Sequence, residues 1–140
     1  MRKGRVIAVV GAQYGSEGKG VVAQWLQGRL PGAVCVRTGG PNAGHSIVHD
    51  GVLYKMQMIP CGWVDSNALL VLGAGAVISP EILVREIDMI ESKFGRGFIA
   101  DRLTIDHNAT VLDPKHHNQE GGHTGEIGHR IGSTGEGVGA

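Results

Sequence analysis

Two glycine-rich segments carry residue types that can bind and process phosphate. The first reads Gly11-Ala-Gln-Tyr-Gly-Ser-Glu-Gly-Lys-Gly20 and follows the apolar run of residues 5–10. A buried strand, a glycine turn and a lysine at the start of a helix gather backbone N–H groups and one cation around a single point, which suits a phosphate. The segment is not a Walker A motif, which needs glycine where Gln13 stands, and its glycines lack the GxGxxG spacing. The alternative is a plain turn followed by an exposed lysine.

The second segment reads Thr38-Gly-Gly-Pro-Asn-Ala-Gly-His45 and follows an expected strand at residues 33–37. Asn42 can read a polar edge of a ligand, and Gly44 lets a carbonyl approach one closely. His45 can act as an acid, a hydrogen-bond donor or an electrophile near neutral pH, although a single loop histidine is more often merely exposed or packed. Two glycine loops after consecutive strands favour a ligand role, because ligands bind at the carboxyl ends of parallel strands.

Other polar residues carry less information. Ser133 and Thr134 lie among glycines near the end of the chain, where they can cradle a monophosphate or belong to a flexible end. The remaining loop histidines match no common zinc spacing, which favours solvated side chains over a metal site. These histidines are His107, His116, His117, His123 and His129.

Length and composition limit the function classes. The chain has 140 residues, enough for one domain, and its 13 basic residues balance 13 acidic ones, which argues against charge-driven binding to nucleic acid or to a membrane. No segment is apolar and long enough for a membrane span or a secretory signal, so we expect a cytoplasmic protein, in the host cytoplasm if it is viral. Cys35 and Cys61 lack metal or redox spacing and are expected to be reduced.

The apolar pattern predicts an α/β fold: a mostly parallel central sheet with a β-hairpin and flanking helices. Continuous apolar runs, typical of strands buried on both faces, lie at residues 5–10, 33–37 and 69–72, and Asp50-Gly51 is a strong hairpin signal. The full set of expected strands is residues 5–10, 33–37, 46–48, 53–58, 69–72, 103–105 and 110–112.

Helices are expected at residues 19–30, 80–94 and 113–120. The second has Ser79 as N-cap, Pro80 in its first turn and Gly95 at its end. The tail from residue 121 to 140 lacks apolar periodicity, so it either binds something or leads into further polypeptide.

These segments resemble, in the same order, sequence blocks of the adenylosuccinate synthetases. Val10-Gly-Ala-Gln-Tyr-Gly-Ser-Glu-Gly-Lys-Gly20 is similar to the family signature GQWGDEGKG, and Gly39-Gly-Pro-Asn-Ala-Gly-His45 to its NAGH loop. Later blocks are similar too: Met56-Gln-Met-Ile-Pro-Cys-Gly62, Leu72-Gly-Ala-Gly75 with Ser79-Pro80, and Ile131-Gly-Ser-Thr-Gly135. The family chain is much longer, so the resemblance implies that residues 1–140 are the N-terminal nucleotide-binding part of a single synthetase domain, with a P-loop-like phosphate loop.

The resemblance implies a two-step ligation with Mg²⁺, in which a nucleoside triphosphate phosphorylates the 6-oxygen of a purine monophosphate and L-aspartate then displaces that phosphate. It implies catalytic roles for Ser16, His45 and Lys19, metal contacts from Ser16 and the Gly44 carbonyl, and a homodimer of the full-length chain. The implied triphosphate-binding residues are Gly15, Ser16, Glu17, Gly18, Lys19, Gly20, Gly44, His45 and Ser46. The implied purine monophosphate-binding residues are Ser16, Asn42, Ala43, Ser133 and Thr134.

Ser16 departs from the family pattern, which has an aspartate there that takes the N1 proton and ligates the metal. A serine hydroxyl is a poor base and a weak neutral metal ligand. The chain is most similar to a phage and archaeal branch with GSEGKG, which implies the reaction of dGMP, L-aspartate and ATP to N6-succino-2-amino-2'-deoxyadenylate. The alternatives are an adenylosuccinate synthetase that uses IMP and GTP and, from another class, a catalytically inactive nucleotide-binding regulator.

Overall fold

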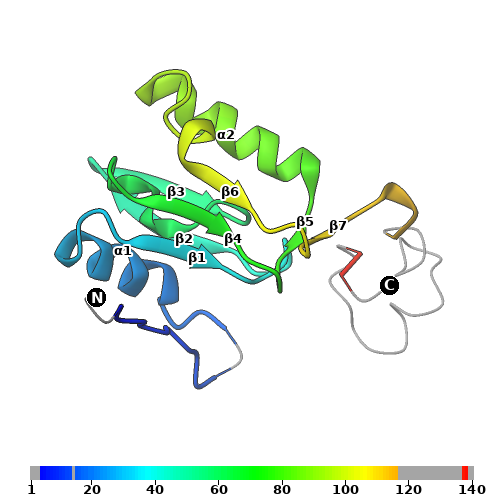
Figure 1. Ribbon diagram of the computed structural model, residues 1–140, viewed down its shortest axis with the longest axis horizontal. Coiled ribbons are helices and arrows are strands. Elements are labelled where there is room, and N and C mark those ends of the chain that lie inside the picture. The colour runs from blue at the N-terminus through cyan, green and yellow to red at the C-terminus, as the bar shows by residue number, and fades with distance from the viewer. Residues whose placement is uncertain (1–3, 14, 117–136, 139–140) are drawn as a thin grey trace.

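The computed structural model describes residues 4–13, 15–116 and 137–138. Its central feature is a three-stranded, wholly parallel sheet with the order β1-β4-β6 (Figure 1). The three strands are β1 (Val34–Arg37), β4 (Leu69–Leu72) and β6 (Leu103–Ile105). All three coincide with predicted strands to within one residue, so the predicted α/β class with a parallel sheet is confirmed.

An antiparallel hairpin packs beside this sheet. It consists of β2 (His45–His49) and β3 (Val52–Met56), and its register pairs His45 with Met56. Asp50 and Gly51 both have positive φ, 48° and 74°, as a two-residue turn of the type preferred in hairpins requires. The hairpin predicted from Asp50-Gly51 is therefore confirmed.

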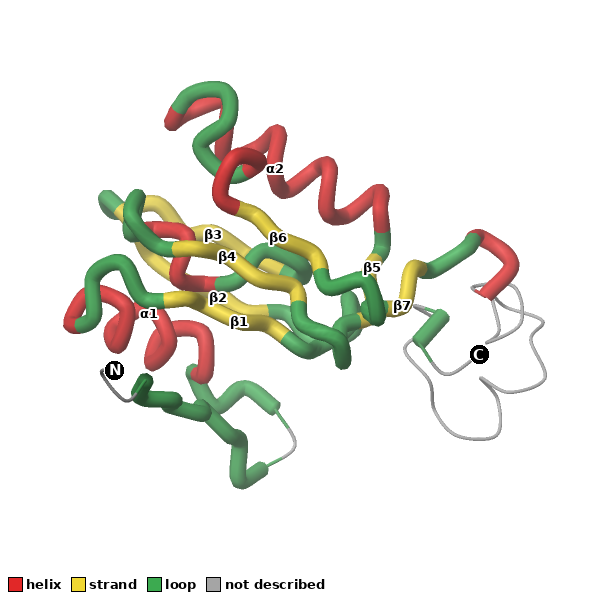
Figure 2. The backbone as a smooth tube through the Cα atoms, viewed as in Figure 1, coloured by secondary structure: helices red, strands yellow, loops and turns green. Residues whose placement is uncertain are grey.

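Two α-helices lie in the described part of the chain, α1 (Lys19–Arg29) and α2 (Pro80–Phe94), as Figure 2 shows. Ser79 caps α2, because its Oγ accepts a hydrogen bond from the Ile82 N–H at 3.4 Å. The helix ends at Gly95, whose φ of 102° is a conformation that L side chains rarely adopt. Of the expected third helix, residues 113–116 are described, and residues 114–116 are helical.

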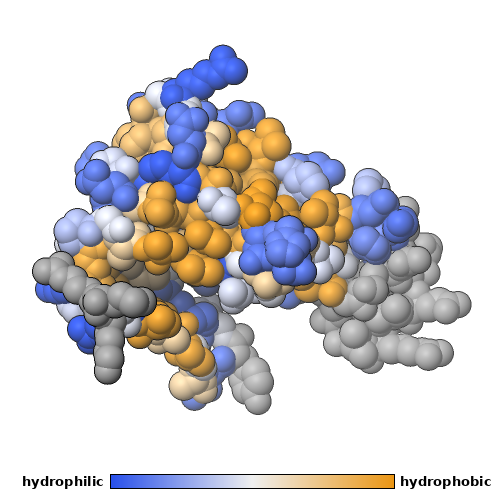
Figure 3. Space-filling model, viewed as in Figure 1, coloured by the Kyte–Doolittle hydropathy of each residue, from blue (hydrophilic) through white to orange (hydrophobic). Residues whose placement is uncertain are grey.

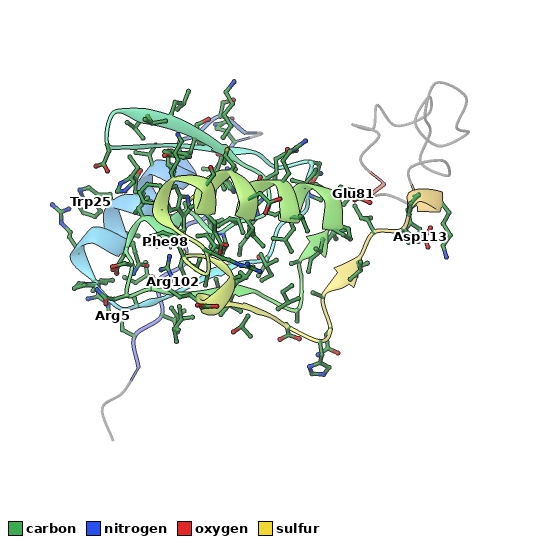
Figure 4. All side chains as sticks on the ribbon, turned by 90° about the horizontal axis from the view of Figure 1, so that it is seen from above. Arg5, Trp25, Glu81, Phe98, Arg102 and Asp113 are labelled. Carbon is green, nitrogen blue, oxygen red and sulfur yellow. The ribbon has the colours of Figure 1, made fainter. Side chains whose placement is uncertain are left out.

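Short elements complete the fold. They are the 3₁₀ turns η1 (Cys61–Val64) and η2 (Ala100–Arg102) and a parallel pair of two-residue strands, β5 (Val77–Ile78) and β7 (Thr110–Val111). The prediction missed β5, because two residues show no alternation. Arg102 in η2 donates to the carbonyls of Trp63, Asp65 and Ala68, and it lies close to Phe98 beyond the end of α2 (Figure 4). One half-buried cation thereby holds the chain between η1 and β4.

The core lies between α2, the hairpin and the inner face of the sheet. Trp63 is fully buried at its centre, with ring centroids 5.0 Å from Tyr54 and 5.5 Å from Phe94. The other large side chains with less than 2% exposure are Ile47, Met56, Met58, Ile59, Leu70, Leu72, Ile90, Ile99 and Pro41. Among the described residues, neither helix combines the length and apolar character required to cross a membrane.

The prediction of a buried strand at residues 5–10 is wrong. Val6 is 92% and Val10 82% exposed, and no backbone hydrogen bond joins this segment to another described strand. A strand exists only where a second backbone satisfies its polar groups, and an apolar run alone does not provide one.

The prediction that the central strands are buried on both faces is also wrong. Val34, Val36 and Leu69 share the outer face of the sheet and are each more than half exposed. We call these three residues, together with Val71, the outer apolar face. Figure 3 shows how much apolar surface lies on one side of the molecule.

Candidate functional site

The first glycine loop leads directly into α1 and has an unusual backbone. Gly15, Ser16 and Gly18 have φ angles of 125°, 55° and 74°. A left-handed conformation at a residue other than glycine costs free energy, and such residues are concentrated at functional sites. Ser16 therefore stands out by its backbone conformation as well as by its residue type. Its side chain is exposed, and no hydrogen bond among the described residues joins it to Lys19 or His45.

The carboxylate of Glu17 lies inside this loop. It accepts a hydrogen bond from the Gln13 N–H at 2.5 Å and forms an ion pair with the Lys19 ammonium group. The Lys19 hydrogen bond, followed by the Gln13 N–H, lowers the pKa of the Glu17 carboxyl. A side chain at Gly11 would collide with the same carboxylate. The loop therefore surrounds an anion, its own carboxylate, with the kinds of donor that bind phosphate oxygens.

The second glycine loop follows β1 and is held from beneath by Arg37. This buried side chain donates from Nη2 to the carbonyls of Gly40 at 3.1 Å and Ala43 at 2.6 Å. Asn42 and Gly44 stay exposed at the surface of the loop. A buried guanidinium thus fixes the backbone while leaving the polar groups of the loop available to a ligand.

The two loops meet where α1 crosses the start of β2. A Cβ atom at Gly20 would lie 2.9 Å from the Cβ of His45 and 3.2 Å from the Sγ of Cys61. Only glycine allows so close an approach. This contact brings the Lys19–Gly20 end of the first loop next to His45, as expected for residues that share one site.

The electrostatics around His45 favour the neutral imidazole. Burial lowers its pKa, and the positive charges of Arg37 and Lys19 lower it further. Cys61 is not an alternative nucleophile near neutral pH, because burial raises the pKa of its thiol to about 12. A neutral histidine beside two cations can donate one hydrogen bond to an oxygen that carries negative charge.

Two cavities border these groups. One, of about 430 Å³, lies along the second loop, and the other, of about 570 Å³, lies between residues 7–13 and α1, with Glu17 and Lys19 in its wall. The first cavity is lined by Pro41, Asn42, Gly44, His45, Ser46, Lys55, Met56 and Gln57.

Sequence reasoning missed Lys55 and Gln57 as lining residues. Gln57 looks like the polar residue between two buried ones in a strand, Met56 and Met58. The signal that could have found it is its position just after β3, whose partner strand β2 begins where the loop of Asn42 ends.

The remaining predicted residues divide into two groups. Ala43 and Ser46 are exposed beside His45, whereas Ser133 and Thr134 lie outside the described residues. Val138 packs against the second glycine loop, since a Cβ atom at Gly40 would lie 3.3 Å from its side chain.

The residues present suit an Mg²⁺ ion carried by a nucleotide better than an ion held by protein alone. No group of three or more metal-binding side chains occurs among the described residues. The two predicted contacts, the Ser16 hydroxyl and the Gly44 carbonyl, are neutral oxygens on exposed residues. Mg²⁺ accepts such hard ligands and commonly takes its remaining contacts from phosphates and water.

The parallel sheet, the flanking helices and the glycine loop at a helix start define an α/β protein with a phosphate-loop type of site. A family model described as "Adenylosuccinate synthetase" matches residues 8–140, and the chain belongs to this family.

The curated relatives include the adenylosuccinate synthetase of Methanococcus vannielii, 40% identical over 132 residues, which are 94% of this chain and 38% of the relative. That of Micrococcus luteus is 40% identical over 134 residues, 95% of this chain and 30% of the relative. The chain therefore spans well under half of these relatives' length.

The chain is similar to several solved structures, of which two are informative. The fully ligated adenylosuccinate synthetase from Plasmodium falciparum has a TM-score of 0.72 and 35% identity, over 84% of this chain and 26% of that one. The cyanophage S-2L succinoaminodeoxyadenylate synthetase (PurZ), described as bound to dGMP and to dATP as an energy donor, has a TM-score of 0.62 and 32% identity, over 77% of this chain and 29% of that one.

Proposed function

We propose that the full-length protein is a ligase that joins L-aspartate to C6 of a purine nucleoside monophosphate through a 6-phosphoryl intermediate. The observation that carries the proposal is the contact between the two glycine loops at Gly20 and His45, beside Lys19. Membership of the adenylosuccinate synthetase family supports the formation of a C–N bond.

In this proposal the first loop binds the triphosphate. Lys19 and the N–H groups of residues 15–20 would hold its oxygens in place of the Glu17 carboxylate, with Gly44, His45 and Ser46 on the opposite side. The neutral His45 would donate a hydrogen bond to the transferring phosphoryl group. The nearby positive charges of Arg37 and Lys19 would stabilise the negative charge of that group.

The second loop binds the purine monophosphate, with Asn42 and Ala43 beside the base and Ser133 and Thr134 at the phosphate. Ser16 and the Gly44 carbonyl would hold Mg²⁺ together with the triphosphate, and the ion would neutralise phosphate charge when bound. A cytoplasmic homodimer remains our prediction for the whole protein.

We place dGMP ahead of IMP because of Ser16. Guanine carries a 2-amino group beside N1, and a carboxylate at position 16 would crowd that edge where a smaller hydroxyl leaves room. The similarity to a phage enzyme described with bound dGMP supports dGMP as a candidate substrate, and the order rests on Ser16. IMP with GTP is the second candidate, since the curated relatives named here and the Plasmodium enzyme are adenylosuccinate synthetases.

The test is an assay of the full-length protein with dGMP or IMP, L-aspartate, Mg²⁺ and either ATP or GTP. We expect turnover of dGMP with ATP. Ser16→Asp should lower kcat/KM for dGMP at least about tenfold more than for IMP, the range that a single pocket contact provides. Ser92→Asp is the matched control, since Ser92 is exposed on α2.

Other results of this assay would favour one of the alternative functions. Turnover of IMP alone would reverse the order of substrates. Nucleotide binding without turnover of either monophosphate would favour the inactive regulator.

A further inference from the structure

A buried carboxylate lies behind the second glycine loop and takes no part in the roles proposed above. Glu86, on α2, is only 3% exposed. Its Oε1 accepts from the Gln57 N–H at 2.5 Å, and its Oε2 accepts from the N–H groups of Met58 at 3.0 Å and Ile59 at 2.8 Å. One side chain thus holds three consecutive backbone donors directly after β3.

The side chain of Gln57 connects residues 57–59, which Glu86 holds, to the second glycine loop. Gln57 donates from Nε2 to the Pro41 carbonyl at 2.7 Å, and both residues line the cavity that contains Asn42 and His45. The position of Glu86 is thereby transmitted to the backbone next to Asn42.

Arg37 holds the same loop from the other side. It binds the carbonyls of Gly40 and Ala43, so buried or lining side chains occupy three carbonyls within residues 40–43. Burial lowers the pKa of the Arg37 guanidinium, and the negative charge of Glu86 is one of the effects that oppose that shift. The cation and the anion that hold this loop therefore attract each other.

We propose that Glu86 is a positioning residue: through Gln57 it fixes residues 41–45 in the shape that binds the purine monophosphate. The ligand in this statement rests on the proposed function, whereas the effect on the loop does not. Glutamine at position 86 would offer one acceptor oxygen and turn an N–H₂ group toward backbone donors. Leucine at position 57 would remove the bond to Pro41 and leave the contacts of Glu86 intact.

Hydrogen exchange of the full-length protein tests the loop directly. In Glu86→Gln the amides of residues 40, 42–45 and 57–59 should exchange about tenfold faster, and in Gln57→Leu only those of residues 40 and 42–45 should do so, since Pro41 has no N–H. Asp88→Asn makes the same acid-to-amide change at an exposed position of α2, and it should leave both segments within about twofold of wild type. Unchanged exchange of residues 40–45 in Gln57→Leu would overturn the proposal, even if Glu86→Gln failed to fold.

Kinetics of the same variants test the ligand. Gln57→Leu should raise KM for the purine monophosphate at least about tenfold while kcat and the triphosphate KM change less than about threefold. A rise in the triphosphate KM alone would overturn the assignment to the monophosphate. If the wild-type protein turned over neither substrate, the proposed function would fail, and the exchange experiment would still decide whether Glu86 positions the loop.

Discussion

His45 is the site residue whose protonation the fold controls most directly. Burial and the charges of Arg37 and Lys19 lower its pKa below the ordinary histidine value of about 6.5, so the folded chain binds a proton less readily than the unfolded chain does. Stability is therefore complete above about pH 6.5, and it falls as the pH drops from there through the lower pKa of the folded state.

We predict that the free energy of unfolding decreases between about pH 7.5 and 5.5, and that His45→Gln makes this decrease smaller. Denaturant unfolding at several pH values measures it. His107→Gln is the control, because it makes the same change at a loop side chain that is 91% exposed. Equal pH dependence in His45→Gln and wild type would contradict the electrostatic account of the site.

At the scale of elements, α2 depends on a local signal at its first turn. Ser79 accepts from the Ile82 N–H and donates to the Glu81 carboxylate at 3.1 Å, and it is 3% exposed. We predict that Ser79→Ala lowers the free energy of unfolding by about 1 kcal/mol, the usual cost of losing a serine N-cap. Ser92→Ala, near the end of the same helix, should stay within about 0.5 kcal/mol. Thermal and denaturant unfolding of both variants decide it, and equal losses would show that the cap contributes nothing.

The same local signals explain which elements could be predicted from the sequence. The cap at Ser79, the stop at Gly95 and the turn at Asp50-Gly51 each depend on neighbouring residues, and each was predicted correctly. Residues 5–10 were misjudged because strand pairing depends on a distant backbone, which an apolar run does not identify.

The site divides in the same way. Glycines, Lys19 and His45 stand out by residue type, and the structure brings Gly20 against His45 as expected. Glu86 could not be found from the sequence, because it looks like an ordinary helical acid and its three partners lie 27 to 29 residues away. Gln57 could not be found either, because it looks like the polar residue of a strand between two buried ones, and its partner Pro41 lies 16 residues away.

At the scale of the whole molecule, the outer apolar face exposes several neighbouring apolar side chains of the sheet to solvent. Val34, Val36 and Leu69 are 55%, 57% and 55% exposed, and they lie next to one another in the parallel register of β1 and β4. Contiguous apolar surface of this kind marks a contact with further protein or a site of association. The net charge of zero offers no electrostatic repulsion to oppose association.

We predict that the 140-residue chain alone binds a hydrophobic dye through this face. Combining Val36→Thr with Leu69→Thr should lower dye fluorescence at least about twofold, because it replaces exposed apolar groups on both strands of the outer apolar face while threonine keeps the preference for a strand. The free energy of unfolding should change by no more than about 1 kcal/mol, since both side chains are exposed. Val84→Thr is the matched control, because Val84 is 56% exposed but lies on α2. If the double variant and the control bound the dye as wild type does, the apolar surface responsible would lie elsewhere, and the exposed run at residues 5–10 would be the next segment to substitute.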